Sequence, residues 1–484
     1  MGGWWLMSSG CVIVLSGCVI VLSGCAAGPD YVKPTLEMPV SWKLEAPWRV
    51  GEPADAALKG PWWQRFGDAQ LDALEEQAVR NNPTLALAST RLAQARAALS
   101  ATSAAVLPQV GLNERAARQR ISANRPQSNY NSPNFATTQN DLVLQMSVGY
   151  ELDLAGRVQR SVEAGQALLG QSAADFENTR LLLTADLASN YFNLRAIDTE
   201  LDVLARAIAL QRRALGFVNA RREGGAGTGL EVAQQQALLD STLVQVEVLQ
   251  RQRSVYEHAL ATLAGVPAPQ FTLGADLRPL APPAVPLGVP SDILERRPDI
   301  AAAERAMAAA NAQIGIARAA FFPSITLGST LGAEGRALSM LFDAPSMLWT
   351  AGLSAAQVLF DGGRIKANID FATAGHAGAV ANYRRVVLGA MQEVEDGITG
   401  LAALDRASAQ AALAVASARR VLDMSRARYE GGASTYLDVI SAQQALLASE
   451  RQATQLLGQQ LLTSVFLVKA LGGDWTSVKV AGGG

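Results

Sequence analysis

A long internal repeat constrains the fold of this 484-residue chain more than any other feature of its sequence. Segments in the first half recur in the second half, in the same order and at nearly constant spacing. The matched segments are Asn82–Pro108 with Arg297–Pro323, Leu154–Arg157 with Asp361–Arg364, Arg221–Gly225 with Arg428–Gly432, and Leu230–Val232 with Leu437–Val439. The sequence therefore predicts an internal tandem repeat, with repeat 1 at 71–265, a linker at 266–290 and repeat 2 at 291–473.

Each repeat contains the same order of predicted elements, and helices are the longest of them. A helix of about 30 residues ends at a proline, and two strands, a very long helix, a Gly-Gly turn and a return helix follow it. The long helices are expected at 157–222 and 364–429, and the return helices at 230–265 and 437–472. Leu187, Leu194 and Leu201 recur every seventh residue, which is typical of a coiled coil. At roughly 100 Å, a helix over 157–222 is too long for a compact domain.

Alternation of apolar and polar residues predicts two strands in each repeat. The strands are expected at 109–118 and 141–154, and at 324–332 and 348–360. Strands of this length can cross a bilayer at a tilt, although two soluble hairpins packed on helices would show the same pattern. Spanning strands must form a closed barrel, and four strands cannot close one, so we expect a spanning chain to oligomerise.

The N-terminus has the pattern of a lipoprotein signal peptide, expected at 1–24. A short apolar run ends in Leu22–Cys25, and cleavage before Cys25 would expose a thiol and an amine for acylation. Because the block CVIVLSGC occurs twice, Cys18 also ends such a motif and is the second choice for lipid attachment. An ordinary cleaved signal is the other alternative. The remaining segments are 25–70, expected as an extended, lipid-anchored equatorial segment, and a C-terminal tail at 474–484.

The composition argues against several classes of protein. Lys and Arg number 41 and Asp and Glu number 43, so there is no basic footprint for nucleic acid. The last of the three cysteines is Cys25, and His258 and His376 each stand alone, so we expect no metal site. Neither a G-x-S-x-G motif nor a P-loop occurs, so we expect no enzyme and no cofactor apart from covalent lipid.

Several motifs on this repeated frame resemble the outer-membrane factor family, which includes TolC and OprM, and especially its NodT-type lipoprotein branch. The motifs are Cys25 with Gly28–Tyr31, Trp62–Asp68, Glu295–Ile300, Phe360–Arg364 and Leu471–Gly473. The resemblance implies an α+β membrane protein, a homotrimer whose chains supply twelve strands to one β-barrel that continues into a long α-helical coiled-coil barrel.

The function that the resemblance implies is that of an exit channel in a tripartite efflux pump of the cell outer membrane. The expected partners are a periplasmic adaptor protein, an inner-membrane transporter of the RND class and outer-membrane lipid. Two alternatives remain: a duct for type I protein secretion, and a periplasmic coiled-coil scaffold that does not span the membrane.

The resemblance also assigns a periplasmic gate to the two hairpin turns. Asp438 matches an acidic gate position, Glu231 is its repeat partner, and Ser441 replaces a further acidic residue. Three other gate residues are Leu437 and Leu230, which match an apolar position, and Tyr429, which matches a tyrosine that hydrogen-bonds across helices. The alternative for Glu231 and Asp438 is that they cap the return helices. The residues expected at the tips, where the adaptor would dock, are Gly224, Gly225, Gly431, Gly432, Arg221 and Arg428.

Overall fold

A computed structural model describes residues 27–33, 60–124, 137–278, 280–283 and 296–473. The signal peptide, Cys18, Cys25 and the tail at 474–484 lie outside these residues. The chain divides into two compact units, which are described separately. The first contains Met1–Pro34, Leu92–Ser172 and Ala303–Tyr383, and the second contains Thr35–Arg91, Ala173–Ala302 and Arg384–Gly484.

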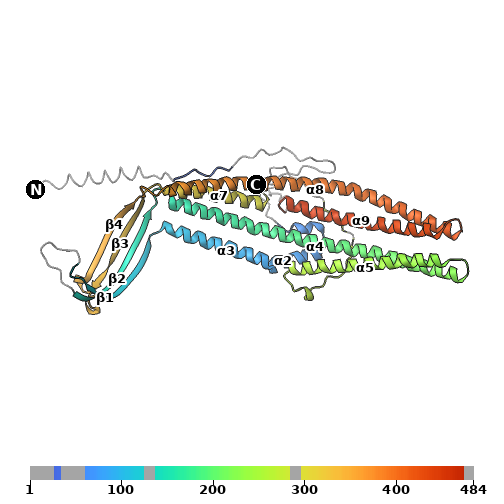
Figure 1. The fold of residues 1–484 in the computed structure, drawn as a ribbon, viewed down its shortest axis with the longest axis horizontal. Coiled ribbons are helices and arrows are strands. Elements are labelled where there is room, and N and C mark those ends of the chain that lie inside the picture. The colour runs from blue at the N-terminus through green and yellow to red at the C-terminus, as the bar shows by residue number, and fades with distance from the viewer. Residues whose placement is uncertain (1–26, 34–59, 125–136, 279, 284–295, 474–484) are drawn as a thin grey trace, which may run out of the picture. The chain divides into compact units, whose positions relative to one another are not determined.

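The first unit is built on an antiparallel four-stranded sheet in the order β1-β2-β3-β4 (Figure 1). The strands are β1 (Gln109–Ile121), β2 (Thr137–Leu152), β3 (Ser324–Gly335) and β4 (Met347–Ala356). Strand β1 continues past its predicted end at 118, and β3 continues past its predicted end at 332. Strand β2 begins before its predicted start at 141. Strand β4 is shorter than the predicted 348–360, because Ala356 pairs with Ser324, the first residue of β3, and nothing remains to pair with 357–360.

The helices that precede the sheet strands are shorter than the predicted length of about 30 residues. Helix α3 (Pro83–Ser103) has 21 residues and α7 (Pro298–Ala319) has 22. Upstream of α3, helix α2 (Ala69–Asn81) ends where Asn82 adopts an extended conformation with ψ of 124°. The residue before a proline is disfavoured in the α region, so Pro83 starts a new helix here. Asn82 then caps α3, because its side chain accepts from Thr84 N at 2.8 Å.

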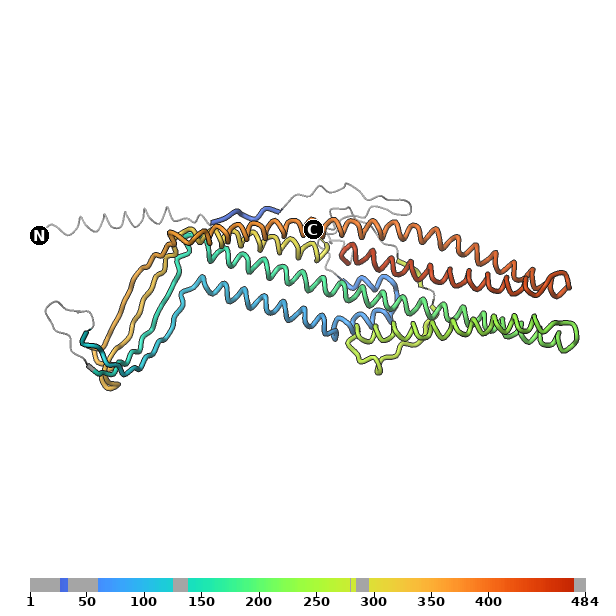
Figure 2. Tube along the Cα trace, in the orientation of Figure 1, coloured from blue at the N-terminus to red at the C-terminus, as the bar shows by residue number. Residues whose placement is uncertain are grey.

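The two repeats give helical hairpins of equal size. Helices α4 (Arg157–Glu223) and α8 (Arg364–Glu430) have 67 residues each, and the return helices α5 (Gly229–Leu263) and α9 (Tyr436–Ala470) have 35 each. In the second unit the hairpins α4–α5 and α8–α9 lie side by side (Figure 2). Leu187 and Leu194 of the predicted seam are fully buried there. None of the described helices combines the length and the apolar composition needed to cross a membrane.

Equivalent contacts hold the ends of both return helices. Asn82 donates its side-chain amide to Leu263 O at 2.8 Å, and Arg297 donates from Nη1 to Ala470 O at 2.8 Å. Arg297 is buried and also forms ion pairs at 2.7 Å with Asp299 and Glu393. The described residues of the Glu295–Ile300 motif therefore have a structural role, because Arg297 holds the end of α9.

Candidate functional site

The two hairpins end in turns of the same backbone geometry. Gly225 and Gly432 have φ angles of 77° and 74°, which glycine adopts without the clash of a Cβ atom. In both turns, three successive backbone N–H groups donate to carbonyls of the last helical turn at 2.8 to 3.0 Å. The donors are Gly224, Gly225 and Ala226 in the first turn, and Gly431, Gly432 and Ala433 in the second. Both helices therefore end in the same hydrogen-bonded reversal.

The two acidic residues of the predicted gate cap the return helices. Thr228 N donates to Glu231 Oε2 at 3.0 Å, and Glu231 N donates to Thr228 Oγ1 at 3.3 Å. In the second hairpin, Thr435 N donates to Asp438 Oδ2 at 3.2 Å. The structure thus gives both carboxylates the capping geometry of the alternative interpretation, and their gate role stays a prediction. Sequence reasoning missed the threonines, although a threonine three residues before an acid signals a capping box.

An aromatic cluster joins the two hairpins close to their turns. The Tyr429 ring lies 5.0 Å from the Tyr436 ring and 6.4 Å from the Phe217 ring, measured between centroids. The Arg221 guanidinium carbon lies 4.7 Å from the Tyr429 centroid, in cation–π geometry. Tyr436 donates its hydroxyl to Gln235 Oε1 at 2.7 Å, so a buried hydrogen bond also crosses from α9 to α5. The contact between Tyr436 and Gln235 was not predicted.

The buried hydroxyl of Tyr429 differs from the prediction that it hydrogen-bonds across helices. It has no hydrogen-bond partner among the described residues. Burial and, after it, the nearby Glu231 carboxylate raise the pKa of Tyr429. Burial is also the main reason why the pKa of Tyr436 rises to about 12. Both phenols therefore stay neutral at physiological pH, and Tyr429 contributes through its ring.

The other predicted tip residues are exposed or interact only locally. Leu230 and Leu437 are 66% and 56% exposed, so neither contributes to the core of its own hairpin. Arg428 donates to Ala433 O at 3.3 Å inside its own turn. Arg221 makes the equivalent bond to Ala226 O at 3.1 Å and in addition stacks on Tyr429.

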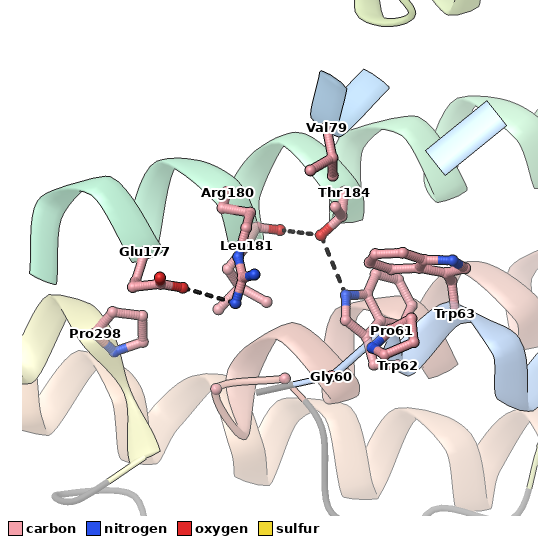
Figure 3. Close-up of a pocket in the computed structure, with 12 residues that line it drawn as sticks. Gly60, Pro61, Trp62, Trp63, Val79, Glu177, Arg180, Leu181, Thr184 and Pro298 are labelled. Carbon is pink, nitrogen blue, oxygen red and sulfur yellow. Dashed lines mark hydrogen bonds and ion pairs between the residues drawn. The ribbon is translucent and has the colours of Figure 1, made fainter. Parts of the chain in front are cut away.

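Residues of the Trp62–Asp68 motif line a cavity of about 160 Å³ in the second unit (Figure 3). Trp62 is 3% exposed and donates from Nε1 to Thr184 Oγ1 at 3.1 Å. Glu177 and Arg180 form an ion pair at 2.7 Å at the same cavity. Asp68 caps α2 by accepting from Gln70 N at 2.9 Å. The motif therefore anchors the start of α2 to the long helix α4.

The motif after Cys25 fastens the N-terminal segment within the first unit. Arg160 donates to Asp30 Oδ1 at 2.8 Å, and Asn311 donates to Pro29 O at 3.0 Å. Tyr31 donates to Glu304 Oε1 at 3.2 Å. Gly28 lies so close to α7 that an added Cβ would stand 2.6 Å from the backbone of Gly315. These contacts fix residues 27–31, and Ala27 lies two positions after the predicted lipid-attachment residue.

The sheet of the first unit has an apolar face and a polar face. Leu112, Met146, Leu331 and Trp349 stand directly opposite one another across the four strands and are 44% to 72% exposed. The adjacent row is small and polar and contains Gly111, Ser147, Thr330 and Thr350, with 2.6 Å between the two threonine hydroxyls. Among the described residues, β1 and β4 each have one partner strand, so the outer edge of each has no described partner. Such edges present unpaired N–H and C=O groups that can pair with another strand.

Comparison with known proteins identifies this combination of sheet and hairpins. The family model described as outer membrane efflux protein matches residues 74–266 and 289–473. The chain belongs to the outer membrane efflux protein family. It is an outer-membrane efflux channel protein of the TolC-like type, and its location is the outer membrane, with a part that extends into the periplasm.

Individual members of the outer membrane efflux protein family match over almost their whole length. The pyoverdine export outer membrane protein OpmQ of Pseudomonas putida is 33% identical over 415 residues, covering 86% of this chain and 88% of the relative. The cation efflux system protein CusC of Escherichia coli is 30% identical over 451 residues, covering 92% and 95%. Among solved structures, the outer-membrane channel OprN matches with a TM-score of 0.84 and 27% identity, covering 93% and 100%.

Proposed function

We propose that this chain is one subunit of a homotrimeric exit channel, whose sheets join edge to edge into a barrel of twelve strands. The observation that carries the proposal is the open-edged sheet with one exposed apolar face. In lipid, unpaired N–H and C=O groups at β1 and β4 would each cost several kcal/mol, so the edges need partners. Joining β4 of one copy to β1 of the next supplies those partners.

Closure of the sheet gives each face a role. The row with Leu112 and Trp349 would face lipid, and the row with Thr330 and Thr350 would line the water-filled pore. In this row the inner face carries glycine and small polar side chains, and Arg115 and Glu334 lie further along the same face.

The helical hairpins would form the periplasmic tunnel and meet the other pump components at their tips. The proposed partners are a periplasmic adaptor protein and an inner-membrane transporter of the RND class. Relatives named for pyoverdine export and for cation efflux support a common duct for different cargoes, so we assign cargo selection to the inner-membrane transporter.

The tips would also close the tunnel. With three copies, Asp438 and Glu231 would give an acidic ring that favours cations, next to the exposed Leu437 and Leu230. Asp438 is exposed while it caps α9, so one carboxylate oxygen can serve each role.

Cys25 is the proposed lipid-attachment residue. The fastening of Ala27 to Ala155 O at 2.9 Å supports it, because a lipid on Cys25 would then start two positions from a fixed point. The substitution Cys25→Ser should abolish palmitate labelling of the full chain. Labelling that persists would move the anchor to Cys18.

The channel function is tested with purified full-length protein. We expect a detergent-solubilised mass of three chains and discrete conductance steps in planar bilayers. Release of the protein from membranes into the soluble fraction, without conductance, would favour the non-spanning scaffold. A type I secretion role is separated by co-purification, since the proposal requires an RND-class transporter and its adaptor as partners.

A further inference from the structure

Helix α5 carries three exposed valines on one face. Val244, Val248 and Val255 are 62%, 52% and 55% exposed, and with 3.6 residues per turn they lie within one narrow stripe. Exposed valines are common singly, so the stripe alone does not define a binding surface. The equivalent residues of the second repeat indicate what this stripe binds.

The equivalent stripe of α9, aligned through the matched pair Arg221 and Arg428, is in contact with α4 of the same chain. Arg451 donates to Glu200 Oε1 at 2.6 Å, and Gln455 donates to the same oxygen at 3.2 Å. One turn further, Gly458 packs so closely that an added Cβ would lie 2.9 Å from the Cβ of Ala196. The stripe that begins at Arg451 is therefore the surface by which α9 binds a long helix.

Helix α8 offers the surface equivalent to the one that α4 uses. Ala403 and Ala407 stand where α4 has Ala196 and Glu200. Ala403 is exposed and Ala407 is half-buried. The chain therefore has one valine face on α5 and one alanine face on α8, and the second repeat shows how such faces fit together.

We propose that the Val244–Val248–Val255 face of α5 binds the Ala403–Ala407 face of α8 in a second copy of this chain. The inference rests on the proposed homotrimer and names the helical surfaces that close it. By equivalence with Gln455 and Glu200, Val248 of one copy lies against Ala407 of the next.

The residue types on the two faces support this pairing, because the α5 face and the α8 face each have apolar residues where the equivalent faces of α9 and α4 have polar ones. Valine at the position of Arg451 would leave a glutamate in the opposite helix buried without a partner, which is strongly destabilising. Alanine replaces that glutamate at Ala407, so the contact becomes apolar on both sides. The contact inside the chain is thus polar, and the contact between copies is apolar.

Site-directed cross-linking of the full chain tests the pairing, since Cys25 is the last native cysteine in the sequence. A Val248→Cys/Ala407→Cys variant is treated in membranes with a short bismaleimide and analysed by denaturing electrophoresis. We expect covalent dimers and trimers. The matched control, Glu200→Cys/Gln455→Cys, should cross-link within the chain and give no such ladder.

Two further results decide the outcome. A Val248→Cys/Leu413→Cys variant places the second thiol on another face of α8 and should give no ladder, and a ladder as strong as that of the test pair would overturn the pairing. Absence of a ladder from the test pair, in protein whose native mass is that of an oligomer, would also overturn it. A monomeric native mass would instead contradict the proposed homotrimer itself.

Discussion

The two helical hairpins have helices of 67 and 35 residues and the same turn, yet their tips are chemically different. The second hairpin has Tyr429 and Tyr436 where the first has Arg222 and Gly229. Both tyrosines are buried against the first hairpin. The shared length and turn preserve the scaffold, and the differences lie on the surfaces where the hairpins meet.

In the proposed homotrimer, this difference would make the tip contact inside a chain stronger than the equivalent contact between copies. Inside the chain, Arg221 stacks on Tyr429, and Tyr436 hydrogen-bonds to Gln235. The equivalent positions between copies would bring Arg428 beside Arg222, so two cations would meet where the chain has a cation and a ring. Gating at the tip is therefore expected to separate copies before it separates hairpins of one chain.

The largest effect is expected when the aromatic link inside the chain is removed. Tyr436→Ala should destabilise the paired hairpins by about 3–5 kcal/mol, because a buried ring and its hydrogen bond are lost. Tyr436→Phe, the matched control, should cost only about 1 kcal/mol. Unfolding temperature in detergent measures both, and equal shifts for the two variants would contradict the role given to the ring.

A smaller effect is expected when the weak contact is made to resemble the strong one. Arg222→Tyr places a ring beside Arg428 of the next copy and recreates the stack, worth about 1 kcal/mol. The stack should stabilise the closed state, so the open probability in planar bilayers should fall roughly fivefold, as that free energy requires. Arg222→Ala, which adds no ring, is the control, and equal open probabilities for the two variants would contradict the stack.

The smallest effects separate the two equivalent arginines. Arg221→Ala should lower the unfolding temperature, because a cation–π contact worth about 1 kcal/mol is removed. Arg428→Ala should change it little, since the described residues give Arg428 only the bond to its own turn. Shifts of equal size would mean that the stack on Tyr429 contributes nothing measurable.

The long-range design could be predicted from sequence because a repeat constrains every element twice. The helix ends at Glu223 and Glu430 follow from glycine pairs, and the strand starts at Gln109 and Ser324 follow from the prolines before them. The break at Asn82 was missed, although an X-Pro step inside a helical pattern predicts it. The length of β4 depends on its partner strand, so the local sequence pattern could not predict it.

The candidate site was predictable only in part, for a different physical reason. The glycines, Glu231 and Asp438 are readable because turn geometry and capping are local. The contacts of Tyr436 with Gln235 and of Arg221 with Tyr429 join residues from different repeats, far apart along the chain. No local pattern encodes such pairs, and the polar contact of Arg451 with Glu200 was missed for the same reason.

The central claim, that the paired turns gate an exit channel, is tested most directly by the single-channel conductance of Asp438 variants in planar bilayers. Asp438→Asn keeps an oxygen that can cap α9 but removes the charge from the acidic ring, whereas Asp438→Ala removes both. We expect a higher conductance than wild type for both variants, with a loss of helix stability of about 1 kcal/mol only for alanine. Unchanged conductance in both would contradict the gate and leave Asp438 as a helix cap.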